Sequence, residues 1–140
     1  MVTLGKAQQD RQTVRLSGVR TDLRGAFVRA LAMWQVRPEL ARLGRPIVTE
    51  GYRSVAEQNR LYAQGRTVPG PVVTYKRGGQ SKHNMLPARA LNVAFLLANG
   101  QVSWSSELFK RFAPLMKAVG PTVRWGGDWP RWKDRPHFEV

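Results

Sequence analysis

The sequence predicts an α+β fold in which helices pack on a small, mostly antiparallel sheet. Apolar residues recur at helical spacing in two separate stretches, and short strand-like segments lie between and after them. The 140 residues include 42% hydrophobic residues and five tryptophans, which is enough apolar material for one core. Because no repeat or linker divides the chain, we expect a single domain over residues 1–140.

The first third of the chain predicts a helix followed by a strand. Residues 1–17 are polar, and we expect them to be the least ordered part of the domain. From about Thr21 to Leu43, apolar residues follow helical spacing, and Gly44 ends that helix. Residues 45–52 contain the β-branched side chains that are typical of a strand.

The middle of the chain predicts a short helix and a long loop. Ser54 is followed three residues later by Glu57, a capping-box pattern that predicts the start of a helix, which Gly65 ends. Residues 66–80 include three glycines and two prolines, so we expect a loop. Loops of this length in a compact domain are usually functional or mobile.

The second half of the chain predicts a hairpin, a helix and two short strands. The apolar segment 90–97 is followed by Asn99-Gly100, which predicts a type I′ turn into a strand over 101–104. The remaining expected elements are a helix over 105–119 and strands over 122–125 and 136–140.

The net charge of +14 is large for a chain of this size and predicts attraction to polyanions. Nucleic acid, anionic lipid and a bacterial wall that carries acidic polymers are all partners of this kind, and a solubilising surface is the alternative use of the charge. No recognised nucleic-acid-binding motif occurs in the sequence, so we expect no nucleic-acid partner.

The composition also limits the compartment and the kind of metal site. With no cysteine, any bound metal must be held by nitrogen and oxygen ligands. No apolar stretch approaches the roughly 20 residues of a membrane-spanning helix. The N-terminal segment lacks the apolar core of a secretory signal, so we expect synthesis in the cytoplasm without a signal peptide. Nothing in the sequence indicates an oligomer, and we expect a monomer.

The only two histidines lie in segments that predict metal chemistry. His83 follows the glycine-rich loop, and Asn92 interrupts an apolar strand, where an unpaired buried amide would cost roughly 1–3 kcal/mol. Asp134 and His137 flank Pro136, which favours a turn entering a strand over a helix. Two imidazoles, one oxygen ligand and a nearby carboxylate are typical of a hydrolytic zinc site. On residue types alone, a core histidine bonded to an aspartate remains an alternative.

Three ordered motifs extend this interpretation. They are Gly51-Tyr52-Arg53-Ser54 with Glu57-Gln58, Ser81-Lys82-His83-Asn84 with Asn92, and Trp125-Gly126-Gly127-Asp128 with Asp134-Arg135-Pro136-His137. Over residues 21–140 the chain resembles the zinc peptidases of the D-alanyl-D-alanine carboxypeptidase and L-alanyl-D-glutamate endopeptidase family. It looks most like the small endolysins of tailed bacteriophages. The resemblance implies a Hedgehog/DD-peptidase-like fold.

The resemblance also implies the ligands and the proton carrier. His83 and His137 match the two histidine zinc ligands, and Asp134 matches the catalytic acid/base. Asn92 stands where the family has its aspartate ligand. Because an amide oxygen is neutral and binds zinc poorly, we expect weaker zinc binding and impaired activity.

Further residues of the motifs have more general roles. Arg53 and Ser81 match positions near the substrate, where a guanidinium can steady a carboxylate or a developing oxyanion. Glu139 is interpreted either as a hydrogen-bond partner of a histidine or as a solvated carboxylate, and Asp128 as a structural residue more than a substitute ligand. The remaining aromatic assignments are Trp34 and Trp104 in the core, with Trp125, Trp129 and Trp132 either in the core or along a peptide cleft.

The function that the resemblance implies is zinc-dependent hydrolysis of the L-alanyl-D-glutamate bond in the stem peptide of bacterial peptidoglycan. The alternatives are a D-alanyl-D-alanine carboxypeptidase and a wall-binding relative without catalysis. The expected partner is peptidoglycan, which an endolysin made in the host cytoplasm reaches after release.

Overall fold

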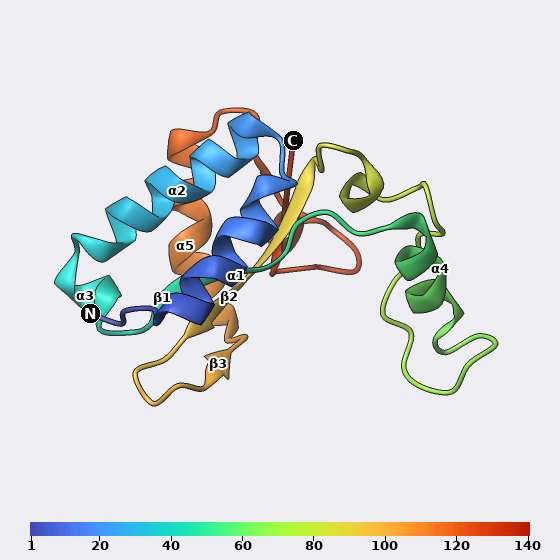
Figure 1. Ribbon diagram of the computed structural model, residues 1–140, viewed down its shortest axis with the longest axis horizontal. Coiled ribbons are helices and arrows are strands. Elements are labelled where there is room, and N and C mark those ends of the chain that lie inside the picture. Colours follow the sequence, from blue (N-terminus) through green and yellow to red (C-terminus); the bar gives the residue numbers. More distant parts are fainter.

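Five strands form one antiparallel sheet around a central strand (Figure 1). The computed structural model describes residues 1–140. The strands are β1 (Arg45–Glu50), β2 (Ala90–Leu96), β3 (Val102–Ser103), β4 (Arg124–Trp125) and β5 (His137–Glu139). Strand β2 pairs with β1, with β3 and with β5, and β4 extends the sheet beyond β5. The predicted α+β fold with a small antiparallel sheet is confirmed.

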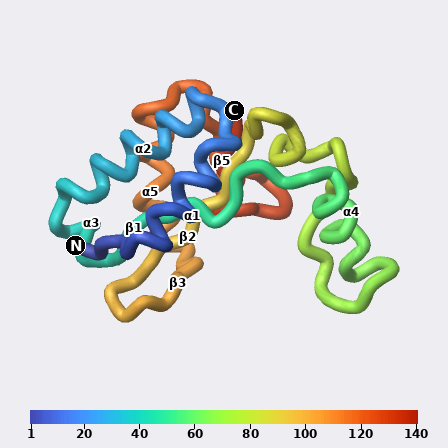
Figure 2. Tube along the Cα trace, viewed as in Figure 1, coloured from blue at the N-terminus to red at the C-terminus, as the bar shows by residue number.

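The helices are α1 (Lys6–Ser17), α2 (Thr21–Gln35), α3 (Pro38–Ala41), α4 (Val55–Ala63) and α5 (Ser106–Val119), with 3-10 turns η1 (Lys82–Asn84) and η2 (Gly126–Asp128). Helices α1, α2 and α5 lie on one side of the long strand β2, whereas α4 stands apart from them (Figures 1 and 2). None of the helices has the length and the apolar content that crossing a bilayer requires.

Strand β2 separates the core from the opposite face of the sheet. Its side chains alternate between the two faces, so Leu91, Val93 and Phe95 belong to the hydrophobic core while Asn92 points the other way. In the register, Asn92 lies opposite Glu50 of β1 and opposite His137 of β5. Directly opposed residues share a face, so three polar side chains are brought into one row across the sheet.

An aromatic cluster fills the core between the sheet and helices α2 and α5. Phe112 of α5 packs edge-on against Phe27, Trp34, Phe95 and Phe138, with ring centroids 5.9–6.1 Å apart. Its side chain is fully buried. Edge-to-face packing is the geometry that aromatic quadrupoles favour. The cluster joins both helices to the core face of the sheet.

Residues 1–17, for which no helix was predicted, contain helix α1. No residue of α1 is buried, so the apolar spacing that marks most helices is missing. Polar contacts hold the helix on β1 instead. The amide of Gln12 bonds both the N–H and the carbonyl of Val48 at 2.8 Å, and Arg15 donates to the same carbonyl at 3.0 Å.

Two local predictions are wrong, one for the length of the first helix and one for the type of the hairpin turn. The helix expected from Thr21 to Leu43 ends at Gln35, and α3 begins at Pro38, because a proline disfavours helical backbone in the residue before it. The β2–β3 turn is not type I′, since only Gly100 of the Asn99-Gly100 pair has positive φ, at 85°.

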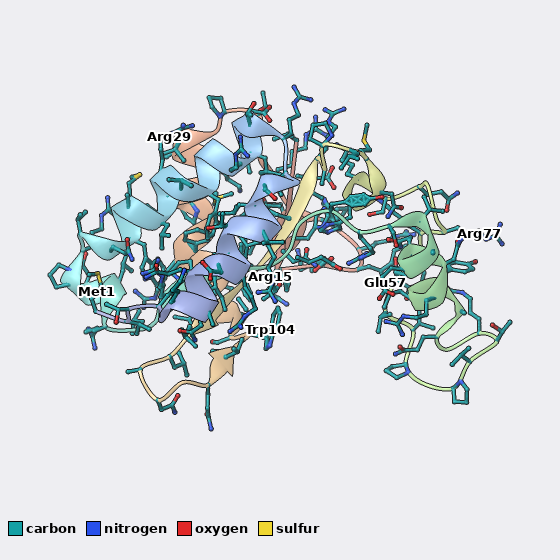
Figure 3. All side chains as sticks on the ribbon, viewed as in Figure 1. Met1, Arg15, Arg29, Glu57, Arg77 and Trp104 are labelled. Atoms are coloured by element: carbon teal, nitrogen blue, oxygen red, sulfur yellow. The ribbon has the colours of Figure 1, made fainter.

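The expectations for Trp34 and Trp104 had different outcomes. Trp34 is fully buried, and its indole N–H donates to the carbonyl of Gly44. Trp104, expected in the core, is 54% exposed and lies beside β3 at the edge of the molecule (Figure 3). It follows a strand of two residues, which is too short to place its side chain against the core.

Helix α4 and the loop after it form the part of the domain that faces the sheet across a cleft. As predicted, Ser54 caps the helix, and its Oγ accepts a hydrogen bond from the Glu57 N–H at 3.0 Å. Residues 66–80 form the predicted loop, and nearly all of them lack regular secondary structure. Basic residues occur in every part of the fold, as Arg15, Arg29 and Arg77 show in Figure 3.

Replacing Phe112 with alanine is expected to lower the free energy of unfolding by about 3–5 kcal/mol, because it leaves a cavity within the aromatic cluster. Urea unfolding followed by circular dichroism measures this change. The control is Glu107→Ala on the exposed face of the same helix, which is expected to change stability by less than about 0.5 kcal/mol. Equal effects of the two substitutions would contradict the packing described above.

Candidate active site

A cleft of about 1050 Å³ lies between the polar face of the sheet and α4. All six residues predicted to form the site line it: Arg53, Ser81, His83, Asn92, Asp134 and His137. They come from the loop before α4, the η1 turn, strand β2 and the segment that ends in β5. The fold therefore brings together residues that are as much as 84 positions apart in the sequence.

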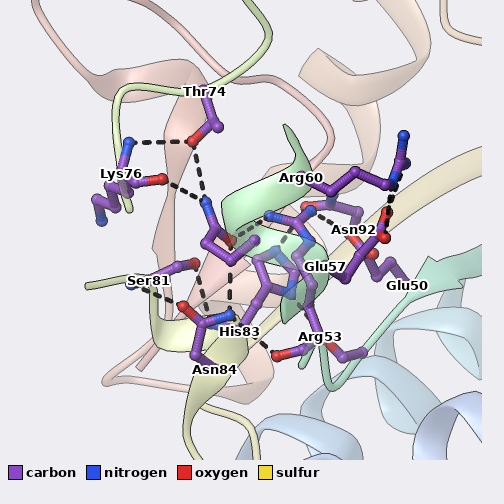
Figure 4. Close-up of polar contacts among 12 residues, drawn as sticks. Glu50, Arg53, Glu57, Arg60, Thr74, Lys76, Ser81, His83, Asn84 and Asn92 are labelled. Atoms are coloured by element: carbon purple, nitrogen blue, oxygen red, sulfur yellow. Dashed lines mark hydrogen bonds and ion pairs between the residues drawn. The ribbon is translucent and has the colours of Figure 1, made fainter. Parts of the chain in front are cut away.

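His83 is held in one orientation by contacts on both its backbone and its ring. Ser81 Oγ accepts a hydrogen bond from the His83 N–H at 3.2 Å, and the His83 carbonyl accepts from the Arg53 N–H at 2.8 Å (Figure 4). The ring Nδ1 lies 2.7 Å from the carbonyl of Gly51. Because a carbonyl only accepts, Nδ1 carries the hydrogen and Nε2 keeps a free lone pair.

Burial keeps the His83 ring neutral. Burial, the largest cause, acts together with the nearby charges of His137 and Arg53 to lower the pKa of His83 from 6.5 to about 4, against the opposing hydrogen bond to the Gly51 carbonyl. At neutral pH the ring is therefore an uncharged nitrogen donor. Gly51 makes this contact possible, because a Cβ at this position would collide with the carbonyl oxygen of Arg15.

His137 is oriented by a buried carboxylate. Its Nε2 lies 2.8 Å from Glu139 Oε1, and Lys82 Nζ lies 2.8 Å from the other oxygen of the same carboxylate. The hydrogen bonds from His137 and Lys82 lower the pKa of Glu139 to about 2 against the effect of burial. An ionised carboxylate only accepts hydrogen bonds, so His137 Nε2 carries the hydrogen and Nδ1 remains the free nitrogen. Of the two interpretations of Glu139, the hydrogen-bond partner is correct.

The two imidazoles and Asn92 meet at one point of the cleft. The ring centroids of His83 and His137 are 5.2 Å apart. His83 Nε2 lies 3.3 Å from Asn92 Oδ1. With Nδ1–H as the donor to Gly51, both of these atoms present lone pairs to each other, and no hydrogen lies between them. Such a contact suits a shared cation.

The donor set fits a zinc ion in type, with two imidazole nitrogens and one oxygen. The oxygen donor is neutral, however, and no three histidine, cysteine or acidic side chains are arranged so that they could hold a metal ion together. Rotating the Asn92 amide by half a turn would place its N–H₂ against His83 Nε2 and make an ordinary hydrogen bond. An aspartate at this position has no such alternative once it is ionised.

Asp134 stands next to His137 in a partly buried position on the cleft. Burial raises the pKa of Asp134 above 3.8, and the charges of His137, Arg53 and Lys76 oppose that increase. The segment is held against η2, where the Asp134 N–H donates to the Gly126 carbonyl at 3.0 Å. Gly126 must be a glycine here, because a Cβ would collide with the Asp134 carbonyl oxygen. This contact explains the spacing between the Gly126-Gly127 motif and Asp134.

Arg53 extends along the floor of the cleft with both ends of its guanidinium engaged. One terminal nitrogen forms an ion pair with Glu50, and the other donates to Gln58 Oε1 at 2.8 Å. Each terminal nitrogen carries two N–H groups, so one on each remains available to a ligand. The Arg53 side chain is 12% exposed.

The remaining acidic and aromatic residues take different places. Asp128 forms an ion pair with Lys117 of α5 and does not line the cleft. Trp125 packs on Phe138 with ring centroids 6.5 Å apart, and its N–H donates to the Arg135 carbonyl. The aromatic side chains that line the cleft are Trp129, Trp132 and Tyr75, and the last two stack with centroids 4.6 Å apart.

Sequence reasoning did not identify Glu50, Gln58 and Lys76 as members of the site. Glu50 and Lys76 line the cleft, and Gln58 is fully buried behind it. Gln58 lies within a motif, and it is a polar residue on the inner side of a short helix. Its occurrence in this motif, on the inner side of the helix, is the only sequence feature that could have indicated that Gln58 belongs to the site.

The comparisons with known proteins agree with this geometry. Residues 74–140 match a family model described as D-alanyl-D-alanine carboxypeptidase. Over 103 residues the chain is 40% identical to the peptidoglycan L-alanyl-D-glutamate endopeptidase CwlK of Bacillus subtilis, a match that covers 67% of this chain and 59% of that protein. The chain thus spans about three fifths of the length of this relative.

A solved structure gives the same answer over most of the fold. The structure of the L-Ala D-Glu endopeptidase ChiX of Serratia marcescens matches with a TM-score of 0.68 and 27% identity. The match covers 93% of this chain and 86% of ChiX. The fold is therefore that of a peptidase domain. The chain therefore contains a domain of the family described as D-alanyl-D-alanine carboxypeptidase, and the two similar proteins are L-alanyl-D-glutamate endopeptidases.

The buried state of His83 predicts a pH dependence of stability in the metal-free protein. Its pKa is lower in the folded protein than in the unfolded chain, so the unfolded chain binds more protons between the two values. The free energy of unfolding should therefore decrease as the pH falls from about 6.5 to about 4, by up to roughly 3 kcal/mol.

Urea titrations across this pH range, with a chelator present, measure the slope. His83→Gln removes the titrating group but leaves Asp134 and Glu139 in place, so its slope in the same window is expected to be shallower. Parallel pH profiles of the two proteins would contradict a neutral, buried His83.

Proposed function

We propose that this protein is a zinc-dependent peptidoglycan endopeptidase that hydrolyses the L-alanyl-D-glutamate bond of the stem peptide. We further propose that Asn92 reduces its activity. The observation that carries the proposal is the meeting of His83, Asn92 and His137 at one point of the cleft, with Asp134 beside them. The names of the two similar proteins support the choice of bond.

The ligand set consists of three residues that line the same cleft, and each of the two histidines has one ring nitrogen without a hydrogen-bond partner of its own in the wall behind it. His83 would bind through Nε2 and His137 through Nδ1, because the other nitrogen of each ring is engaged by Gly51 or Glu139. Asn92 would contribute Oδ1. A bound zinc ion would supply Lewis-acid polarisation of the scissile carbonyl and lower the pKa of a bound water.

Asp134 is the residue suited to proton transfer. Its burial raises its pKa above 3.8, which makes the carboxylate a better proton acceptor than a solvated aspartate. It would take a proton from the attacking water and deliver one to the leaving amine. The backbone contact with Gly126 holds it in place for both steps.

Arg53 is the residue suited to binding negative charge in the substrate. Its guanidinium is fixed by Glu50 and Gln58, and the unused N–H groups can bind a carboxylate or the oxyanion that develops on the scissile carbonyl. Ser81 supports the site less directly, since its Oγ already accepts a hydrogen bond from His83.

Asn92 weakens the metal site in two ways. A neutral amide oxygen does not offset the charge of zinc. Loss of a hydrogen-bond partner behind a metal ligand lowers metal affinity by roughly 10- to 100-fold, and loss of a charged oxygen ligand should lower it by at least as much. The amide can also satisfy His83 with its own N–H₂ when no metal is bound. The substitution therefore both destabilises the metal-bound state and stabilises the metal-free state.

The setting of the activity is part of the same proposal. The spacing between His83 and Asn92 resembles that of small phage endolysins, and the net charge of +14 would attract the protein to an anionic wall. We therefore propose an endolysin that is made in the host cytoplasm and reaches peptidoglycan after release.

Replacing Asn92 with aspartate is expected to raise zinc affinity by at least about 10- to 100-fold and to increase hydrolysis of stem peptides. Isothermal titration with zinc and chromatography of peptides cleaved between L-alanine and D-glutamate measure the two effects. The matched control is Asn92→Asp combined with Asp134→Asn, which is expected to bind zinc and to cleave at least about 100-fold more slowly.

Three results would decide between the candidate functions. Stoichiometric zinc without cleavage of any muropeptide by the Asn92→Asp protein would refute the proposal. Release of only the terminal D-alanine would identify a carboxypeptidase, which the description of the matching family model favours. Wall binding that is equal with and without zinc, with no gain of hydrolysis on substitution, would identify a wall-binding protein.

A further inference from the structure

Gln58 is an amide with no direct access to the cleft, yet it contacts three parts of the cleft wall. It is the only buried residue of helix α4 and is fully inaccessible to solvent. A buried amide that lacked partners would cost about 1–3 kcal/mol. Gln58 avoids this cost because hydrogen bonds engage both ends of its amide.

The carbonyl end of the Gln58 amide faces the arginine of the site. Oε1 accepts from Arg53 Nη1 at 2.8 Å and lies 3.5 Å from Asn84 Nδ2. Asn84 follows His83 in the η1 turn, and its Nδ2 also donates to the Arg53 carbonyl at 2.9 Å. The carbonyl end therefore connects the guanidinium to the turn that carries His83 (Figure 4).

The other end of the amide faces the loop on the far side of the cleft. Nε2 donates to the Lys76 carbonyl at 2.7 Å and to Thr74 Oγ1 at 3.2 Å (Figure 4). Residues 74–76 belong to the loop without regular secondary structure, and Tyr75 and Lys76 line the cleft. These two hydrogen bonds fix the position of a loop segment that belongs to no helix or strand.

The guanidinium of Arg53 depends on this contact for its direction. Its Nε is buried without a hydrogen-bond partner, so only the two terminal nitrogens hold the group. Glu50 holds one of them and Gln58 holds the other. Without Gln58 the guanidinium could rotate about its remaining partner, and the N–H groups available to the substrate would no longer point in one direction.

We propose that Gln58 is a positioning residue, which aims the Arg53 guanidinium at the substrate and fixes residues 74–76 as the facing wall of the cleft. This inference rests on the proposed peptidase function for its kinetic consequence. A small displacement of a group that contacts the substrate can cost about 100-fold in rate. The contribution of Gln58 should therefore appear in the catalytic constants as well as in stability.

The test uses the full chain with Asn92→Asp as the parent protein, because that form is expected to bind zinc and to hydrolyse stem peptides. Gln58→Met keeps the length of the side chain but removes both hydrogen-bonding ends. We expect kcat/KM to fall by about 10- to 100-fold. Gln58→Glu keeps an acceptor for Arg53 and loses the donor to Lys76 and Thr74, so its loss is expected to be smaller.

A double-mutant cycle separates positioning of Arg53 from a general loss of structure. In the Arg53→Met background, adding Gln58→Met is expected to lower kcat/KM by a clearly smaller factor than in the parent protein, because the group that Gln58 positions is already absent and only the contacts with residues 74–76 remain to be lost. A loss of kcat/KM in the double variant equal to the product of the two single losses would overturn the proposal. So would a loss in Gln58→Glu equal to that in Gln58→Met.

The matched control is Gln12→Met, which removes a glutamine outside the cleft whose amide is also hydrogen-bonded at both ends. The Gln12 amide makes two hydrogen bonds of 2.8 Å to Val48. This variant is expected to lower the free energy of unfolding and to leave kcat/KM unchanged. If its kinetic loss matched that of Gln58→Met, the role of Gln58 would be only structural.

A second measurement does not depend on activity. In the metal-free protein, the Arg53 Nε–H is buried and should exchange slowly with solvent, which nitrogen-15 NMR can follow. Gln58→Met is expected to accelerate this exchange by at least about 10-fold, and unchanged exchange would overturn the proposal. If the parent cleaves no peptide, the proposed function fails, while this measurement still decides whether Gln58 positions Arg53.

Discussion

The pairing of β2 with β1 on one side and β5 on the other is the constraint on which the site depends. It places Asn92 between Glu50 and His137 on the face of the sheet that is turned away from the core. A shift of one residue in this register would turn Asn92 into the core and its apolar neighbours into the cleft. The aromatic cluster around Phe112 opposes such a shift, because a shift of one residue would turn Phe95 of β2 out of its edge-on contact with Phe112.

Each histidine of the site, and Arg53, is oriented by a partner that would not itself contact a bound metal or substrate. The Gly51 carbonyl selects the tautomer of His83, Glu139 selects that of His137, and Gln58 with Glu50 directs Arg53. Such outer partners are what give a metal or substrate site its geometry. In this protein they are all present, and the residue at position 92 is a neutral amide.

Local sequence patterns predicted most of the elements for identifiable reasons. Ser54 begins α4 by the contact that its side chain makes with the Glu57 N–H, and the apolar spacing of α5 reflects the face that it buries. The same reasoning failed for α1, which Gln12 attaches to β1 through polar contacts, and for the turn at Asn99-Gly100. For α1 the outcome depends on a neighbouring strand, and local propensity contains no information about that neighbour.

For the site, the sequence by itself determined which groups are present: two imidazoles, an amide, a nearby aspartate and an arginine. It also determined the family, because ordered motifs preserve residue types and spacing. Only the tertiary structure decided that Glu139 orients His137, that Asp128 pairs with Lys117 away from the cleft, and that Gln58 connects Arg53 to the far wall. These contacts join residues whose separation in the chain says nothing about their distance in space, and that distance is set by strand register and by packing of the core.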